Sequence, residues 1–298
     1  VYKRQVRGIE KPPADIKMQE YAFRRSTTAN PFPSMMGRVC PAPCQDGCNR
    51  NNVEDFVGIN AVEQYIGDQA IAEGFSFSCT EEMSGKKVAI VGGGPAGMSA
   101  AYQLRKLGHA SVIFESHDKL GGMMRFGIPS YRTPDSHLDP EINRILAMGH
   151  IDVQLNTVVG KDISAESLEK DYDAVLWAIG CWTGRALPVP NSDAPNCISA
   201  IKYLEASRQK RLHVTAKKVV CIGGGDTSID VVCSSRRLGT TKGELSEDIR
   251  PENILKEGSA HDKKLAEGRI HNDVTLTTLL LASSEICTSP SCFPKKFT

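Results

Sequence analysis

The sequence predicts an α/β protein in which two doubly wound, Rossmann-like domains follow a small helical domain that contains cysteines. Three observations predict this fold class. An apolar strand, a glycine-rich turn and a helix follow one another from Lys87 onward, and the same order recurs from Lys218 onward. Three cysteines lie close together within residues 40–48. Strands that alternate with helices are typical of a parallel sheet covered by helices.

The overall composition narrows the function classes. The 298 residues carry 36 Lys and Arg against 35 Asp and Glu, a formal net charge of +1. General nucleic-acid binding needs a basic face, so we expect no nucleic-acid partner. No apolar run reaches the roughly 18 residues that a membrane-spanning helix requires, and we expect no membrane partner. Ten cysteines without a visible signal peptide favour a reducing, cytoplasmic location and metal or redox roles for the thiols.

The first 85 residues read as a helical segment interrupted by a loop rich in proline and cysteine. We expect a short helix over residues 15–25, a breaker-rich stretch over 30–33 and a loop over 37–48. A longer helix is predicted over residues 58–74, where apolar side chains recur at helical spacing. Residues 80–85 read as a linker.

A strand–turn–helix–strand order then begins. Strands are predicted over residues 88–91, 111–114, 151–155 and 173–179, and helices over 98–107 and 141–148. Gly108 is the expected C-terminal cap of the first of these helices.

The second strand–turn–helix order consists of a strand over residues 218–222 and a helix over 229–238. Residues 242–273 are polar and charged, which predicts a surface insertion. One more strand is predicted over 274–281. The last residues have no periodicity, and we expect them to be irregular.

The first glycine turn has the spacing of a dinucleotide site, Gly92-x-Gly94-x-x-Gly97. The first glycine permits a tight turn, the second lets the backbone approach a pyrophosphate, and the third lets the helix pack on the strand. The N-terminus of the helix offers N–H groups to the phosphates. Glu115, at the end of the next strand, is the expected ligand of ribose hydroxyls. A glycine-rich turn of another α/β protein is the alternative interpretation.

The second glycine turn has the spacing Gly223-x-Gly225-x-x-Ser228, with a small residue at the third position. Two such turns in one chain predict two dinucleotides, for example FAD and a nicotinamide cofactor. A structural repeat that binds no ligand is the alternative. No strand follows the second helix directly, so the residues that would contact the adenosine ribose are not identified.

The cysteine loop has the spacing Cys40-x3-Cys44-x3-Cys48. Thiolates are soft ligands that suit iron–sulfur clusters or zinc. Three cysteines do not complete a tetrahedral site, and Glu63 on the following helix is a candidate extra ligand. Three reduced thiols in a proline-rich loop are the simpler interpretation. Among the remaining cysteines, three are predicted to be small core residues: Cys181, Cys221 and Cys233.

Together these stretches resemble the flavoproteins related to the small subunit of glutamate synthase. The same architecture occurs in the N-terminal part of dihydropyrimidine dehydrogenase and in the large subunit of NADH-dependent ferredoxin:NADP oxidoreductase. The resemblance covers roughly residues 30–240, and the stretches that carry it are Asn30–Pro33 with Gly37–Pro41, Val88–Gly97 with Gly121-Gly122, Phe126–Arg132, Tyr172–Gly180 and Gly223–Thr227.

The resemblance implies that the first turn binds FAD and the second binds NAD(P)H. The residues implied around the FAD pyrophosphate are Gly92, Gly94, Pro95, Ala96 and Gly97. Glu115 is implied at the adenosine ribose, and Gly122, Met123 and Arg132 along the flavin. The residues implied at the nicotinamide dinucleotide are Gly223, Gly224, Gly225, Asp226 and Thr227. No catalytic side chain is expected, because the cofactors carry the chemistry.

The resemblance also implies two [4Fe–4S] clusters in the helical domain. Cys40 and Cys44 would serve one cluster, with Glu63 as its candidate non-cysteine ligand, and Cys48 would serve the other. The upstream cysteines of the family are absent, so these residues cannot complete either cluster. The chain also lacks the arginine-bearing strand and the C-terminal Gly-Asp segment of the family, and we interpret it as a fragment of a longer protein.

The implied function is that of an oxidoreductase subunit that passes electrons from NAD(P)H through FAD to iron–sulfur clusters and a partner subunit. The expected domains are a helical iron–sulfur domain over residues 1–80, an FAD domain over 86–205 and an NAD(P)H domain over 206–298. Three other classes stay open: a simple flavin-dependent reductase without clusters, a non-catalytic assembly module and a zinc-dependent scaffold.

Overall fold

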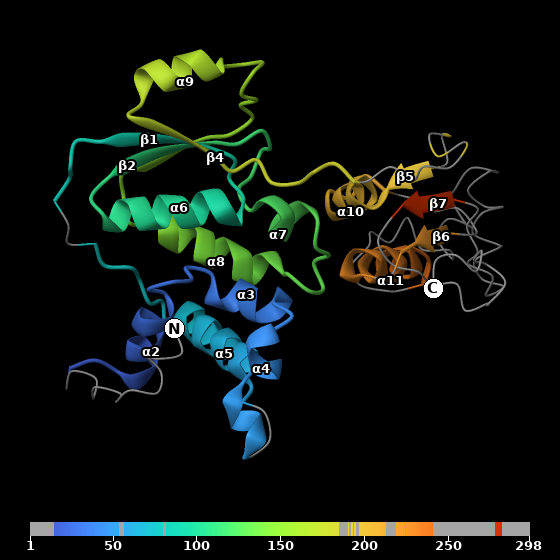
Figure 1. The fold of residues 1–298 in the computed structure, drawn as a ribbon, viewed down its shortest axis with the longest axis horizontal. Coiled ribbons are helices and arrows are strands. Elements are labelled where there is room, and N and C mark those ends of the chain that lie inside the picture. Colours follow the sequence, from blue (N-terminus) through green and yellow to red (C-terminus); the bar gives the residue numbers. More distant parts are fainter. Residues whose placement is uncertain are drawn as a thin grey trace, which may run out of the picture. The chain divides into compact units, whose positions relative to one another are not determined.

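The computed structural model describes residues 15–53, 57–79, 82–184, 190, 192, 194, 197–212, 219–223, 225–240 and 278–281. The chain divides into two compact units, whose elements are labelled in Figure 1. The first unit comprises the described parts of residues 1–124 and 131–180, and the second those of 125–130 and 181–298. The predicted domain boundaries after residues 80 and 205 stay predictions. The predicted insertion at 242–273 and the irregular C-terminal stretch lie outside the described residues.

The first unit begins with helices and continues as an α/β sheet. Its helical part contains α2 (Met18–Ser26), α3 (Pro33–Val39), α4 (Pro43–Asp46), a 3-10 helix η1 (Asn49–Asn52) and α5 (Ile59–Ala72). Its α/β part contains β1 (Lys87–Val91), α6 (Pro95–Lys106), β2 (Ala110–Phe114), α8 (Asp135–Leu146), β3 (Ile151–Gln154), α9 (Ala165–Asp171) and β4 (Ala174–Trp177). The short helix α7 (Gly122–Phe126) contributes its first residues to this unit.

The four strands of the first unit form a parallel sheet in the order β3-β2-β1-β4. Successive side chains of a strand point to opposite faces, and both faces of β1 are covered. Ile90 belongs to the core that includes residues of α6 and α8, whereas Ala89 and Val91 belong to a second core with Leu168 of α9. Figure 1 shows α6 and α8 on one side of the sheet and α9 on the other. The predicted doubly wound arrangement is confirmed.

Local signals in the sequence explain where helix α6 begins and ends. Pro95 occupies the first position of the helix, where its missing N–H removes no helical bond. At the other end, Gly108 has a φ of +79°, and its N–H bonds to Arg105 O (3.1 Å). His109 N–H then bonds to Leu104 O (2.9 Å), which completes a Schellman motif. The predicted glycine cap is confirmed.

The second unit is a smaller α/β assembly. It contains β5 (Cys197–Ser199), α10 (Ala200–Arg208), β6 (Val219–Ile222), α11 (Asp226–Thr240) and β7 (Thr278–Leu281). The three strands are parallel in the order β5-β7-β6. The predicted strand at residues 274–281 is observed over its last four residues, and residues 274–277 lie outside the described part.

Three sequence predictions need correction. The segment at 37–48 is not a continuous loop, because α3 extends to Val39 and Pro43 begins the helical turn α4 with its fixed φ. Helix α8 begins at Asp135 rather than 141, because Leu138 in its first turns is fully buried in the core. Cys181 is exposed and not a core residue, since it follows the last residue of the first unit.

No helix of the described residues is both long enough and apolar enough to cross a lipid bilayer.

Candidate functional site

The first glycine turn lies at the carboxyl end of β1, between the strand and helix α6. Gly92 has a φ of +111°, and its N–H donates to Phe114 O of the neighbouring strand (2.8 Å). A Cβ atom at Gly92 would lie 2.3 Å from Ala178 O. A left-handed φ and a backbone contact this close both require glycine at this position.

The third glycine of the turn lets the helix approach the strand. A Cβ atom at Gly97 would lie 2.0 Å from Gly92 O and 3.0 Å from Ile90 Cγ2. The first helical hydrogen bond of α6 runs from Met98 N to Gly94 O (3.0 Å). The N–H groups of Ala96 and Gly97 precede this bond, so they face outward at the positive end of a 12-residue helix.

A second glycine pair closes on the first turn. Gly121 N donates to Gly93 O (2.9 Å). Gly122 has a φ of +50°, and a Cβ atom on it would lie 2.7 Å from Gly94 Cα. The two loops therefore touch backbone to backbone. Gly122 was predicted as a site residue, whereas the contact of Gly121 with the turn was missed, because no local spacing rule connects positions so far apart in the sequence.

Glu115 follows β2 and reaches back to the turn. Its Oε2 accepts the N–H of Gly93 (2.7 Å), and the side chain is only 7% exposed. Its Oε1 accepts the N–H of His117 (2.9 Å), and the His117 Nδ1 lies at the same distance. Burial alone would raise the pKa of Glu115, but the hydrogen bonds from His117, Gly93 and Ser116 outweigh it and hold the pKa below its usual value. Glu115 is therefore an ionised acceptor beside the glycine turn.

Two predicted flavin residues lie in the segment that follows the second glycine pair. Met123 is half-buried in α7, and Arg132 is half-buried between α7 and α8. Thr133, next to Arg132, is fully buried and donates from Oγ1 to Met124 O (3.0 Å). The roles of Met123 and Arg132 toward a flavin stay predictions.

The second glycine turn repeats part of the first. Gly223 has a φ of +130°, and helix α11 begins at Asp226 directly after Gly225. Ser228, at the third position, is fully buried where α11 packs on β6. A small residue is therefore required there for helix packing. Gly224 lies outside the described residues, and the roles of Gly223, Gly225, Asp226 and Thr227 toward a dinucleotide stay predictions.

The predicted metal ligands lie on successive elements of the helical part, and their roles stay predictions. Cys40 caps the end of α3 and accepts the Ala42 N–H at its sulfur (3.4 Å). Cys44 lies within α4, and Cys48 follows it just before the 3-10 helix. Glu63 Oε1 accepts a hydrogen bond from the Asn30 side chain (2.8 Å). Within the described part of the chain, no three His, Cys, Asp or Glu side chains are arranged to hold a metal ion.

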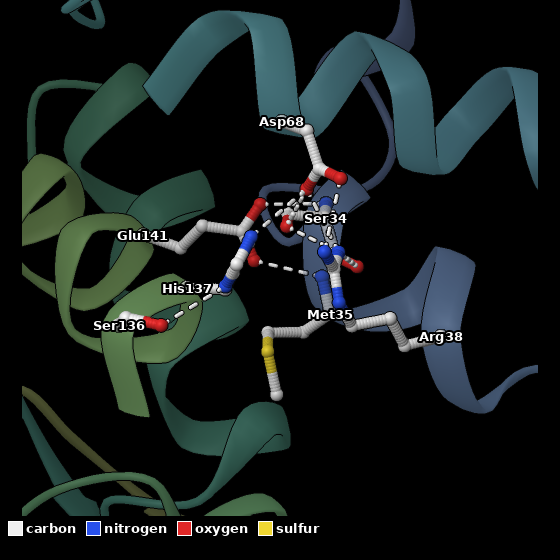
Figure 2. Close-up of polar contacts among 7 residues, drawn as sticks. All are labelled: Ser34, Met35, Arg38, Asp68, Ser136, His137 and Glu141. Atoms are coloured by element: carbon white, nitrogen blue, oxygen red, sulfur yellow. Dashed lines mark hydrogen bonds and ion pairs between the residues drawn. The ribbon is translucent and has the colours of Figure 1, made fainter. Parts of the chain in front are cut away.

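A partly buried polar network, shown in Figure 2, connects the helical part of the first unit to helix α8. Glu141 is fully buried and accepts the N–H groups of Ser34 (2.8 Å) and Met35 (3.1 Å). These are the second and third residues of α3, so Glu141 caps that helix from outside it. Burial raises the pKa of Glu141 to about 7. Sequence patterns could not show this contact, because its partners lie more than 100 positions apart.

Asp68 of α5 supports the same network. It forms a two-pronged ion pair with Arg38 (2.8 and 2.9 Å) and accepts the Ser34 hydroxyl (2.5 Å). His137 Nε2 lies 3.8 Å from Asp68 Oδ1. Figure 2 draws both side chains. Burial opposes ionisation of Asp68, but the hydrogen bonds from Arg38 and Ser34 prevail and lower its pKa.

Two family descriptions match the chain. Residues 86–282 match the pyridine nucleotide-disulphide oxidoreductase family. Residues 14–75 match domain II of dihydropyrimidine dehydrogenase, described as a 4Fe-4S cluster domain. The second match covers the segment with Cys40, Cys44 and Cys48, and the first match contains both glycine turns.

Similar proteins are known from several organisms. The glutamate synthase [NADPH] small chain of Mycobacterium tuberculosis is 36% identical over 232 residues, which cover 73% of this chain and 47% of that protein. The glutamate synthase [NADH] of Schizosaccharomyces pombe is 40% identical over 231 residues, 73% of this chain and 11% of that protein. The NADP(+)-dependent formate dehydrogenase subunit beta of Moorella thermoacetica is 35% identical over 252 residues, 76% of this chain and 35% of that protein.

These matches confirm the resemblance drawn from the glycine turns and the cysteine loop. The matched part of the chain spans less than half the length of each of these relatives.

Proposed function

This chain belongs to the pyridine nucleotide-disulphide oxidoreductase family, and from that premise we propose that it is the cofactor-binding part of an electron-transferring flavoprotein subunit. The proposed reaction passes electrons from NAD(P)H through FAD to iron–sulfur clusters and onward to an acceptor. The observation that carries the proposal is the closed cradle formed by the first glycine turn, the Gly121-Gly122 pair and Glu115.

The cradle fits the diphosphate of FAD. Gly92 and Gly97 have no room for a Cβ atom, so the tight turn and the close packing of α6 require glycine at both positions. A Cβ atom at Gly94 would meet only Gly122 Cα, at 3.6 Å, so the absence of a side chain there lets a ligand approach the main chain of the turn. The outward N–H groups at the start of α6 would bind the phosphate oxygens, and the helix dipole would add to the attraction. The ionised Glu115 would accept hydrogen bonds from the adenosine ribose.

When bound, FAD would supply a group that accepts electrons in pairs and releases them singly. The residues of this chain would hold the cofactor, orient it and shield its adenosine half. No side chain is required as a general acid or base, because the cofactors carry the chemistry.

The second glycine turn is the proposed NAD(P)H site. Gly223 has a left-handed φ at the end of β6, Ser228 is buried, and helix α11 begins directly after the turn. The N-terminus of a helix in this position after a strand is suited to bind phosphates. We propose Gly223, Gly224, Gly225, Asp226 and Thr227 as the contacting residues.

The cysteine-containing segment does not by itself fit a complete cluster. A [4Fe–4S] cluster of the usual kind takes four cysteine thiolates, and residues 14–75 contain only Cys40, Cys44 and Cys48. Even when Glu63 is counted as an extra ligand, no three of these side chains are arranged to hold a metal ion in the part of the chain that the structure describes. We derive no electron-transfer step through a cluster.

We also propose a partner subunit and a cytoplasmic location. Relatives named as a small chain or a subunit beta support a partner of the electron-accepting kind. The eight cysteines of the described part of the chain are all free thiols, which fits a reducing compartment.

The proposed function is tested by adding FAD to the purified chain, removing free flavin and recording the flavin absorbance. NADH and NADPH oxidation is then followed with ferricyanide as acceptor. We expect bound flavin and FAD-dependent oxidation. A chain that retains no FAD would contradict the proposal.

A further inference from the structure

The carboxylate of Glu115 is hydrogen-bonded unequally at its two oxygens. Oε2 accepts one hydrogen bond, from Gly93 N (2.7 Å). Oε1 lies within hydrogen-bond distance of three donors: Ser116 Oγ (3.1 Å), His117 N (2.9 Å) and His117 Nδ1 (2.9 Å). A carboxylate oxygen has about two lone-pair sites. Oε1 is therefore saturated, and only Oε2 keeps capacity for a further donor.

His117 supplies two of the three donors to Oε1, and its own position is fixed. Its carbonyl oxygen accepts the Asn156 N–H (2.9 Å), and the adjacent Thr157 N–H bonds to Glu115 O (2.9 Å). The side chains of His117 and Glu115 are 21% and 7% exposed. Hydrogen bonds to a buried carboxylate are stronger than those at the surface because little water competes for the oxygens.

We propose that His117 is a positioning residue of the flavin site, which holds Glu115 so that Oε2 faces the Gly93 amide and remains the acceptor for the adenosine ribose. This inference rests on the proposed function. His117 acts through Glu115 and does not itself contact the ligand. With the imidazole removed, Oε1 keeps only the Ser116 hydroxyl and the main-chain N–H of residue 117 as donors. The carboxylate is then held less firmly about its last bond, which loosens the geometry of the Gly93 hydrogen bond and of the ribose acceptor.

The test measures the dissociation constant of FAD by flavin fluorescence and that of ADP by competition with FAD. Both constants are compared between the full chain and its variants. We expect His117→Ala to weaken both ligands by about the same factor, roughly 5- to 10-fold, since both contain the adenosine ribose that meets Glu115. His117→Asn should recover most of the affinity, because the Asn amide nitrogen stands where Nδ1 stood. His109→Ala is the matched control, because its ring bonds to the exposed Ser84 hydroxyl before β2 begins.

A coupling measurement separates positioning from general damage to the fold. In a Glu115→Gln background, His117→Ala should change the FAD dissociation constant less than about twofold, because residues that act in series do not add. Unchanged FAD affinity in His117→Ala, a failure of His117→Asn to restore binding, or full additivity with Glu115→Gln would each overturn the inference. If the unmodified chain binds no FAD, the proposed function itself fails. If it binds FAD but the His117 variants behave otherwise than expected, only this inference fails.

Discussion

Single glycine residues set the shape of the candidate flavin site. The most restrictive contact is at Gly97, where a Cβ atom would meet the backbone oxygen of Gly92 at 2.0 Å. A backbone oxygen cannot rotate away as a flexible side chain could, so the helix must shift from the strand. This shift would also move the N–H groups that the proposed site directs at the phosphates.

We therefore predict that Gly97→Ala lowers the free energy of unfolding by about 1–3 kcal/mol, the usual cost of overpacking. FAD affinity should fall at least tenfold. Urea unfolding and flavin fluorescence measure the two effects. Gly47→Ala is the control, because Gly47 has a negative φ of −86° and an added Cβ would make an ordinary contact of 3.7 Å with Pro43 O. Wild-type stability and FAD binding in Gly97→Ala would show that the contact is relieved without cost.

The sequence predicted these glycines because their spacing is local and has one physical explanation at each position. Glu115 was predicted for the same reason. Other residue-scale features depend on long-range packing. The contact between Gly121 and Gly93 joins positions far apart, and the exposure of Cys181 depends on where one unit ends. Neither the Gly121–Gly93 contact nor the exposure of Cys181 could be predicted from composition.

Helix α3 illustrates how an element is held by a residue outside it. It is a 7-residue helix whose N-cap residue, Phe32, provides no side-chain cap. Short helices are marginal without tertiary support. Glu141 of α8 accepts two of the N–H groups that the helix leaves unpaired, and Met35 lies in the same core as α8. The N-terminal end of this helix is thus placed by a contact with the α/β part of the unit.

We predict that Glu141→Ala speeds amide hydrogen exchange in residues 34–40 at least tenfold, because two N–H groups lose their acceptor. Exchange in β2 should change far less. Mass spectrometry of deuterated peptides measures both. Glu169→Gln, a substitution at an exposed position of α9, is the control. Equal protection of α3 in wild type and Glu141→Ala would show that the cap does not stabilise the helix.

The strands and the long helices could be predicted from periodicity and turn residues, as the boundaries of α5, β1 and β2 show. The helices α3 and α4 could not, because prolines and cysteines suggested an irregular loop there. In the structure α3 packs against α5 and α8, and α4 packs against α5. Propensity is a weak guide wherever tertiary contacts decide the outcome.

At the scale of the whole molecule, two strand–turn–helix signals predicted two α/β assemblies, and both are observed. The association of the helical part with the first sheet was not predictable. It depends on the Glu141 contacts, on Tyr102 donating to Thr27 O (2.7 Å) and on Arg144 donating to Phe75 O (2.7 Å). Each of these contacts joins a residue of the helical part to a residue of the α/β part of the first unit. No local sequence pattern indicates any of them.

Glu141 is buried between the helical part and the α/β part of the first unit. The stability of this unit therefore depends on pH through the protonation of Glu141. Its pKa is raised by burial from about 4.5 in the unfolded chain to about 7 in the folded one. Between these two pH values, the folded state therefore keeps a proton on Glu141 that the unfolded state has released. The stabilisation is complete below about pH 4.5 and is lost as the pH rises through 7. The charged or titratable groups near Glu141 are Arg144 and His137 of α8, Arg38 of α3 and Asp68 of α5.

We predict that the free energy of unfolding of the wild type, relative to that of Glu141→Gln, falls by about 1–3 kcal/mol between pH 5 and pH 8. Glutamine keeps one acceptor oxygen and cannot titrate in this window. The lowered pKa values of Asp68 and Glu115 act in the opposite direction, but their stabilisation is lost only as the pH falls into the acidic range, below this window. Urea unfolding at both pH values measures the difference, and Glu169→Gln should follow the wild type. If wild type and Glu141→Gln have parallel pH profiles, Glu141 is ionised throughout. The buried carboxylate would then be stabilised by the two amides and the neighbouring arginines strongly enough to cancel its desolvation.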